Sequence, residues 1–146
     1  MEQMVTLLQS ISQTAYKSQE TVKTIASYPE ISDVPYIKRL NLLLGEIHTN
    51  SVRAIFKVIS KSGETELKEC LLIMYRSMKF IEEIHIDMKG ALPETLPEKL
   101  KEWLDKNLES LNSLFIQLVP SIEGFFEEEE TQWIISATKD SSSFMV

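Results

Sequence analysis

Apolar residues recur at alternating steps of three and four along four segments of this chain. The segments cover residues 4–25, 37–58, 67–88 and 104–125. Because steps of three and four keep side chains on one face of an α-helix, each segment carries an apolar stripe that another helix must cover. The pattern therefore predicts four amphipathic helices that pack together through four seams.

Proline and glycine stand mostly between these segments and predict where the helices begin and end. Pro29 stops the first helix near residue 27, since the residue before a proline avoids the α region. The second helix is expected to begin with Asp33 as its N-cap and Pro35 in its first turn. Gly90 is expected to end the third helix in a left-handed conformation. Connectors this short make each helix return antiparallel to the one before it.

The fourth segment carries the most specific local signal. Residues 95–98 (Thr-Leu-Pro-Glu) match a capping box, in which Thr95 caps the helix and Pro97 lies in its first turn. Pro120 clashes with the preceding turn, yet the heptad phase continues to Phe125. The fourth helix should therefore kink at Pro120, or be continued there by a short fifth helix packed in line.

These signals predict an all-α protein, an elongated antiparallel up-down-up-down four-helix bundle about 38 Å long. Apolar residues beside the seams, among them Ile55, Ile59 and Phe80, are expected to widen the buried stripes. Residues 1–128 form the bundle domain in this prediction. Residues 129–146 form a C-terminal tail that is partly disordered or binds a partner.

The net charge of the chain limits the kinds of molecule that it is expected to bind. The chain of 146 residues has a formal net charge of −7, which opposes binding to nucleic acid and to anionic membranes. No segment is apolar for long enough to insert into a membrane. Residues 33–63 hold five bases and two acids, whereas residues 127–146 hold five acids and one base. These are either two solvated faces or surfaces that select a partner.

A single cysteine, Cys70, lies beside the third seam and is expected to be a buried, reduced thiol. We expect an intracellular protein of the reducing cytoplasm. Glu82 and His85 have the spacing used in di-iron bundles, but such sites need a second pair, and the matching position before His48 is Gly45. We therefore expect no metal and no cofactor.

The segment around His85 offers one resemblance to a known family. His85-Ile86-Asp87-Met88-Lys89-Gly90 resembles the active segment of histidine phosphotransfer domains, which are also four-helix bundles. The family has its lysine three residues after the histidine and its glycine four after, whereas here they stand four and five after. The resemblance implies a phosphoryl-accepting His85 assisted by Lys89, which requires an exposed histidine.

The C-terminal region combines large apolar side chains with an acidic run, and exposed aromatic residues beside charge make good interface anchors. An alternative is that residues 133–135 fold back and cap the bundle. The terminal carboxylate resembles those captured by strand-adding peptide-recognition domains. The candidate partner-binding residues are Phe126, Glu127, Glu128, Glu129, Glu130, Trp133, Ile134, Phe144, Met145 and Val146.

No set of residues in the sequence forms a recognisable catalytic site. The prediction is a non-enzymatic protein–protein interaction module of the adaptor, chaperone-like or regulatory kind. It would bind a helix or peptide of another protein, in a groove between helices or through the C-terminal segment. A homodimer formed through an exposed part of a seam is the nearest variant, and histidine phosphotransfer by His85 and Lys89 is the alternative.

Overall fold

The computed structural model describes residues 2–31, 35–61 and 63–137, and this part of the chain is helical with short connections. Four long helices form the body, and three short helical segments accompany them. The long helices are α1 (Glu2–Ala26), α2 (Pro35–Ser60), α3 (Glu64–Lys89) and α4 (Glu98–Ile122). The short segments are η1 (Pro29–Ile31), η2 (Glu123–Phe125) and α5 (Glu128–Ala137). The predicted all-α fold is confirmed.

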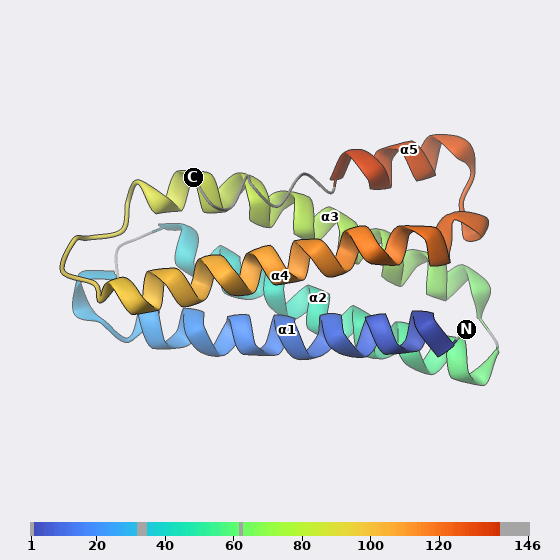
Figure 1. Ribbon diagram of the computed structural model, residues 1–146, viewed down its shortest axis with the longest axis horizontal. Coiled ribbons are helices and arrows are strands. Elements are labelled where there is room, and N and C mark those ends of the chain that lie inside the picture. The colour runs from blue at the N-terminus through green and yellow to red at the C-terminus, as the bar shows by residue number, and fades with distance from the viewer. Residues whose placement is uncertain (1, 32–34, 62, 138–146) are drawn as a thin grey trace.

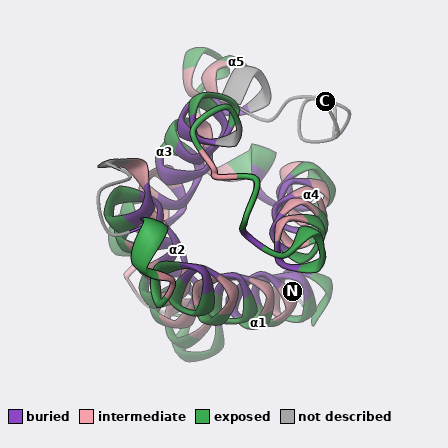
Figure 2. Ribbon diagram, turned by 90° about the vertical axis from the view of Figure 1, so that its left-hand side faces the viewer, coloured by how far each residue is buried: buried purple, intermediate pink, exposed green. Residues whose placement is uncertain are grey.

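The four long helices run side by side in alternating directions, as Figure 1 shows. α1 packs along both α2 and α4, and α2 also packs along α3. Figure 2, which views the bundle from one end, shows the buried residues turned toward the space enclosed by the four helices. The body is thus an elongated antiparallel four-helix bundle.

The four predicted seams form the core. Every residue of the first three seams is buried: Met4, Leu8, Ile11, Ala15, Ser18, Val22 and Ile25 on α1, Ile37, Leu40, Leu44, Ile47, Ser51, Ala54 and Val58 on α2, and Leu67, Leu71, Met74, Met78, Ile81, His85 and Met88 on α3. The α4 seam residues Leu104, Leu108, Leu111, Phe115, Leu118 and Ile122 are buried as well. Phe125, at the end of the fourth seam, is half-buried in η2. Cys70 is 1% exposed, as expected, and this burial raises the pKa of its thiol. Heptad spacing therefore identified most of the interior, and further buried residues such as Tyr75, Leu96 and Ile134 lie outside the seams.

The connections differ from the expectations in two places. Gly90 has φ −72°, so it is right-handed and not left-handed as predicted. The predicted capping box is also wrong, because α4 begins at Glu98 and its N-cap position is Pro97, with no side-chain cap. The intervening chain makes a turn in which the Leu96 N–H donates to Pro93 O, and this turn buries the Leu96 side chain. Burial of an apolar side chain here outweighs the capping hydrogen bond.

α4 continues through Pro120 and ends two residues later, at Ile122. The chain then turns through η2 and becomes extended at Phe126, with φ −120° and ψ 152°. A short fifth helix follows, but α5 doubles back beside α3 and does not continue α4 in line (Figure 1). The extended residue at Phe126 provides the reversal that the seam pattern did not predict.

α3 and α4 are the neighbouring long helices whose backbones approach each other least closely, and Figure 2 shows their wider separation. Large side chains fill the space between them. The fully buried rings of Tyr75 and Phe115 meet edge to face, with 4.8 Å between their centroids. The α3–α4 interface is therefore held by side chains that reach across the bundle.

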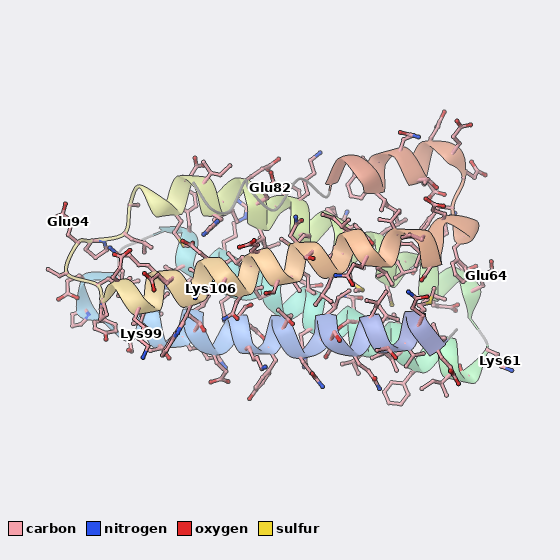
Figure 3. The ribbon with its side chains drawn as sticks, in the orientation of Figure 1. Lys61, Glu64, Glu82, Glu94, Lys99 and Lys106 are labelled. Atoms are coloured by element: carbon pink, nitrogen blue, oxygen red, sulfur yellow. The ribbon has the colours of Figure 1, made fainter. Side chains whose placement is uncertain are left out.

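Charged side chains lie along the outside of the bundle and at its two ends (Figure 3). Lys61 and Glu64 lie at the end where α2 meets α3, and Glu94 and Lys99 lie at the opposite end. Among the described helices, none is both long enough and apolar enough to cross a membrane.

Candidate functional site

Three of the C-terminal candidate residues, Phe126, Trp133 and Ile134, pack against the bundle. Ile134 of α5 is 2% exposed, and Phe126 and Trp133 are half-buried against the core. Beside Trp133 lies a hollow of about 450 Å³ whose apolar wall is formed by Leu72 and Ile73 of α3. α5 therefore covers part of an apolar face of α3 and leaves part of it open.

Two lysines of α3 hold α5 in place from the side. Lys68 Nζ lies 2.8 Å from Glu130 Oε1 and 5.6 Å from the centroid of the Phe126 ring. Lys79 Nζ lies 5.9 Å from the centroid of the Trp133 ring. Hydrogen bonding between the two groups raises the pKa of Lys68 and lowers the pKa of Glu130. These contacts are partly exposed, so they orient α5 more than they anchor it.

The remaining residues of this candidate site fall into two groups. Glu127, Glu128 and Glu129 are exposed at the start of α5, where acids suit the positive end of a helix dipole. The Glu127 N–H also donates to Glu130 Oε1 at 3.2 Å. Phe144, Met145 and Val146 lie outside the described residues.

His85 is buried in the interface between α3 and α4. Its side chain is 1% exposed, and its Nε2–H donates to Asp105 Oδ1 at 2.7 Å. Lys89 is the last residue of α3, and its side chain is outside the described part of the chain. The His85 ring is therefore covered, and its Nε2 is already hydrogen-bonded to a carboxylate. Both features hinder transfer of a phosphoryl group to this ring.

Glu82 is a buried polar residue that the seam pattern did not indicate. It lies one turn before His85 on α3 and is 4% exposed, although it does not occupy a seam position. Over the described residues, no three side chains of the metal-binding types come together. The spacing of Glu82 and His85 thus places a carboxylate and an imidazole close together without a further set of ligands.

The second histidine joins α1 to α2. His48 Nδ1 lies 3.1 Å from Ser12 Oγ and 3.2 Å from Ser12 O, and its ring packs 5.8 Å from that of Tyr16. Further along the same pair of helices, Gln19 Nε2 donates to Asn41 O at 3.3 Å. Polar side chains therefore close the outer side of the α1–α2 interface.

The outer face of α2 holds the most exposed large apolar side chains of the described residues. Leu42 is 69% exposed, Phe56 is 68% exposed and Ile59 is 63% exposed. Of the residues expected to widen the buried stripes, Ile55 is half-buried against the core, whereas the expectation was wrong for Ile59 and for Phe80, which is 36% exposed. Leu42 and Phe56 were missed as candidates, although they are separated by two heptads outside the core seam.

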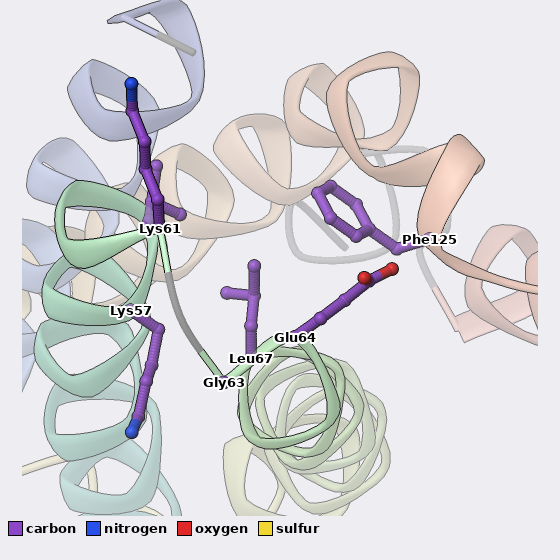
Figure 4. A pocket seen from close by; sticks show the side chains of 7 residues that line it. Lys57, Lys61, Gly63, Glu64, Leu67 and Phe125 are labelled. Carbon is purple, nitrogen blue, oxygen red and sulfur yellow. The ribbon is translucent and has the colours of Figure 1, made fainter.

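One further hollow lies at the end of the bundle where α2, α3 and η2 meet. It has a volume of about 310 Å³, and Figure 4 shows Leu67 and Phe125 on its walls. The side chains of Lys57 and Lys61 extend in different directions, so their amines do not converge on one point (Figure 4). This arrangement does not build a site for a single anion.

Taken together, these sites define a class of protein: an all-α bundle with a docked C-terminal helix and an uncovered apolar face on α2. No protein-family model matches the chain, no curated protein is significantly similar to it, and no solved structure matches it.

Proposed function

We propose that this chain is a non-enzymatic protein–protein interaction module, an adaptor, chaperone-like or regulatory subunit that binds a helical segment of another protein. The observation that carries the proposal is the set of exposed apolar side chains on α2, formed by Leu42, Phe56 and Ile59. Single exposed apolar residues are normal on any protein, whereas an aligned set on one helix is typical of an interaction site.

The free energy available for binding comes from the apolar area that α2 leaves in contact with water. Covering a leucine, isoleucine or phenylalanine side chain completely contributes about 1.5–3 kcal/mol. Leu42, Phe56 and Ile59 each expose more than half of their surface. A partner that covers these side chains gains enough free energy to offset part of the entropy lost on association.

The C-terminal segment is a second route to the same function. Its acids Glu127, Glu128 and Glu129 are exposed, while Phe126 and Trp133 are half-buried and held by lysines of α3. A partner would contact the acids directly, or it would displace α5 and use the α3 face beneath it. The second case is helix-in-groove recognition, whereas the first is recognition of an acidic motif by basic residues of the partner.

Histidine phosphotransfer receives less support from the geometry. A phosphoryl-accepting histidine must reach the phosphoaspartate of its partner, and a ring that is 1% exposed and bonded to Asp105 does not. We therefore base the proposed function on the α2 face and not on His85.

The test compares partner capture by two variants that each replace two exposed apolar side chains. The double variant Leu42→Gln/Phe56→Gln should lose a stoichiometric partner from native cell extract, identified by mass spectrometry. The control Ile86→Gln/Ile116→Gln changes exposed side chains of α3 and α4 and should keep that partner. Equal capture by both variants, or no partner at all, would contradict an α2 binding face. Loss only when residues 128–146 are removed would move the site to the C-terminal segment.

A further inference from the structure

The exposed face of α2 has the spacing of a helix-binding surface. Two heptad rows lie side by side on it, outside the buried seam: Leu42, Thr49 and Phe56 in one row, and Gly45, Val52 and Ile59 in the other. From Leu42 to Ile59 the face extends about 26 Å, at 1.5 Å per residue. This length matches about five turns of a partner helix.

Side chains in the middle of this face are smaller than those at its ends. Gly45 has no side chain, but Gln19 of α1 already lies over it, since a Cβ there would be 3.2 Å from Gln19 Nε2; the low part of the face therefore lies between Gly45 and Phe56. Thr49 and Val52 are also small, whereas Leu42 and Phe56 stand at the two sides of this stretch. Small residues between large ones allow a second helix to approach α2 closely and to fit its own side chains between them.

Near Ile59 the face opens into a hollow between α1 and α2. This hollow has a volume of about 410 Å³, and Val5 of α1 and Val58 and Ile59 of α2 form its apolar wall. It is large enough to receive one apolar side chain of a partner. The α2 face therefore ends in a pocket that is suited to an anchoring residue.

The charge of α2 itself is positive although the protein is acidic, and Glu2 of α1 lines the hollow beside Ile59. The described residues of α2 include four bases (Lys38, Arg39, Arg53 and Lys57) and one acid (Glu46). The whole chain, by contrast, has 22 acidic and 15 basic residues. Arg39 and Arg53 are exposed and form a heptad row with Glu46 directly beside Leu42 and Phe56. No ion pair between described residues involves these four bases.

We propose that the α2 face binds an acidic amphipathic helix of a partner protein. This inference rests on the proposed function and adds the chemistry of the partner. Apolar residues of the partner helix, spaced by heptads, would cover Leu42, Phe56 and Ile59. Its Asp and Glu residues would lie beside Arg39 and Arg53, where opposite charges fix the orientation and speed association.

Charge also argues against the other occupants of this face. A two-fold dimer through the face would bring together the four bases and one acid of α2 from each copy, and this excess of like charge across the interface is unfavourable. A net charge of −7 opposes an anionic membrane or nucleic acid. The chain already holds one acidic helix against lysines, since α5 docks beside Lys68 and Lys79 of α3.

The test uses two synthetic peptides of about 18 residues, long enough for five helical turns. Both carry leucine at heptad positions, and the remaining positions are mainly glutamate in one peptide and mainly lysine in the other. Fluorescence anisotropy with the full chain should show the acidic peptide binding at least about tenfold more tightly, with the difference reduced by added salt. Equal affinity for the two peptides, or no binding of the acidic one, would overturn the proposal.

Variants then locate the binding site. Phe56→Gln, and separately Arg39→Glu/Arg53→Glu, should each weaken binding of the acidic peptide about tenfold, while Arg39→Lys/Arg53→Lys should keep most of it. The control Lys106→Glu reverses an exposed charge on α4 and should change little (Figure 3). Circular dichroism of each variant shows that the fold is retained. Loss of binding in the control as well would contradict a site on α2.

Three further measurements separate this inference from the proposed function and from other occupants. If the captured partner is lost with Leu42→Gln/Phe56→Gln but kept by Arg39→Glu/Arg53→Glu, the interaction module stands and the acidic helix is refuted. Light scattering that detects a dimer disrupted by Phe56→Gln would assign the face to a second copy. Preferential binding to vesicles of phosphatidylserine and phosphatidylcholine would assign it to a lipid surface. Either of these last results overturns the proposal.

Discussion

The hydroxyl group of Tyr75 on α3 donates a hydrogen bond to the main-chain carbonyl of Phe115 on α4, with 2.7 Å between the two oxygen atoms. The two rings also meet edge to face. This pair connects the two neighbouring helices whose backbones lie farthest apart. Burial raises the pKa of Tyr75 far above its ordinary value, so its hydroxyl remains a donor at any pH at which proteins are handled.

We expect Tyr75→Phe to lower the free energy of unfolding by about 1 kcal/mol, the usual net contribution of a buried hydrogen bond. Urea denaturation followed by circular dichroism measures the change. Tyr16→Phe is the matched control, because Tyr16 is 52% exposed and its change should stay within about 0.5 kcal/mol. Equal effects of the two substitutions would show that the Tyr75 hydroxyl does not stabilise the interface.

The contact between His85 and Asp105 should stabilise the same interface. We expect Asp105→Ala to lower the free energy of unfolding by about 1–3 kcal/mol, since it leaves a buried imidazole without this acceptor. Asp105→Asn keeps an acceptor oxygen and should cost less. The control is Asp87→Ala, at an exposed position of α3. No difference between Asp105→Ala and this control would contradict a structural role for the pair.

Docking of α5 should depend on pH through Lys68 and Glu130. The pKa of Glu130 is lowered in the folded chain, so its contribution is complete above the ordinary glutamate pKa, near 4.3, and is lost as pH falls through the lower folded value. The pKa of Lys68 is raised, so its contribution is complete below the ordinary lysine pKa, near 10.4, and is lost as pH rises through the raised value. Docking should therefore weaken at both extremes of pH.

Trp133 fluorescence reports this docking in a Trp103→Phe background, because Trp133 packs beside Lys79. The emission should shift to longer wavelength in acid before helix content falls. Glu130→Gln should remove the acid-dependent shift and leave the alkaline one to the remaining acids near Lys68. An unchanged acid transition in Glu130→Gln would refute the role of this carboxylate.

Two leucines of α2 provide a direct test of which face is free. Leu44 is fully buried, whereas Leu42 is 69% exposed, although only one residue separates them. We expect Leu44→Ala to lower the free energy of unfolding by about 2–5 kcal/mol and Leu42→Ala to change it by less than about 0.5 kcal/mol. Thermal denaturation of the two variants measures the difference. A large loss of stability in Leu42→Ala would mean that this face is part of the fold.

The candidate sites were only partly visible in the sequence. The sequence shows the heptad spacing of Leu42 and Phe56. The buried seam of the same helix contains more apolar residues, however, and it was enough to explain the apolar content of α2. Glu82 carried no signal of burial, because its position lies outside the third seam. The sequence showed large aromatic side chains in the C-terminal segment. It was equally consistent with their being exposed and with their folding back onto the bundle.

The sequence by itself determined the four long helices and the face that each one buries. This follows because heptad spacing is a local property: it depends only on the turn of the helix and the order of residues along it. The effect of a proline on the backbone is equally local. Pro29 agrees with the end of α1, and Pro35 agrees with the start of α2.

Tertiary structure alone decided which apolar residues remain uncovered and where the chain reverses. Ile59 extends a stripe in the sequence, yet it is exposed because no described helix packs against that side of α2. The pairing of His85 with Asp105 depends on how α3 and α4 are aligned, and the return of α5 depends on the extended backbone at Phe126. Each of these outcomes depends on contacts between segments distant in the sequence, and no local pattern encodes such contacts.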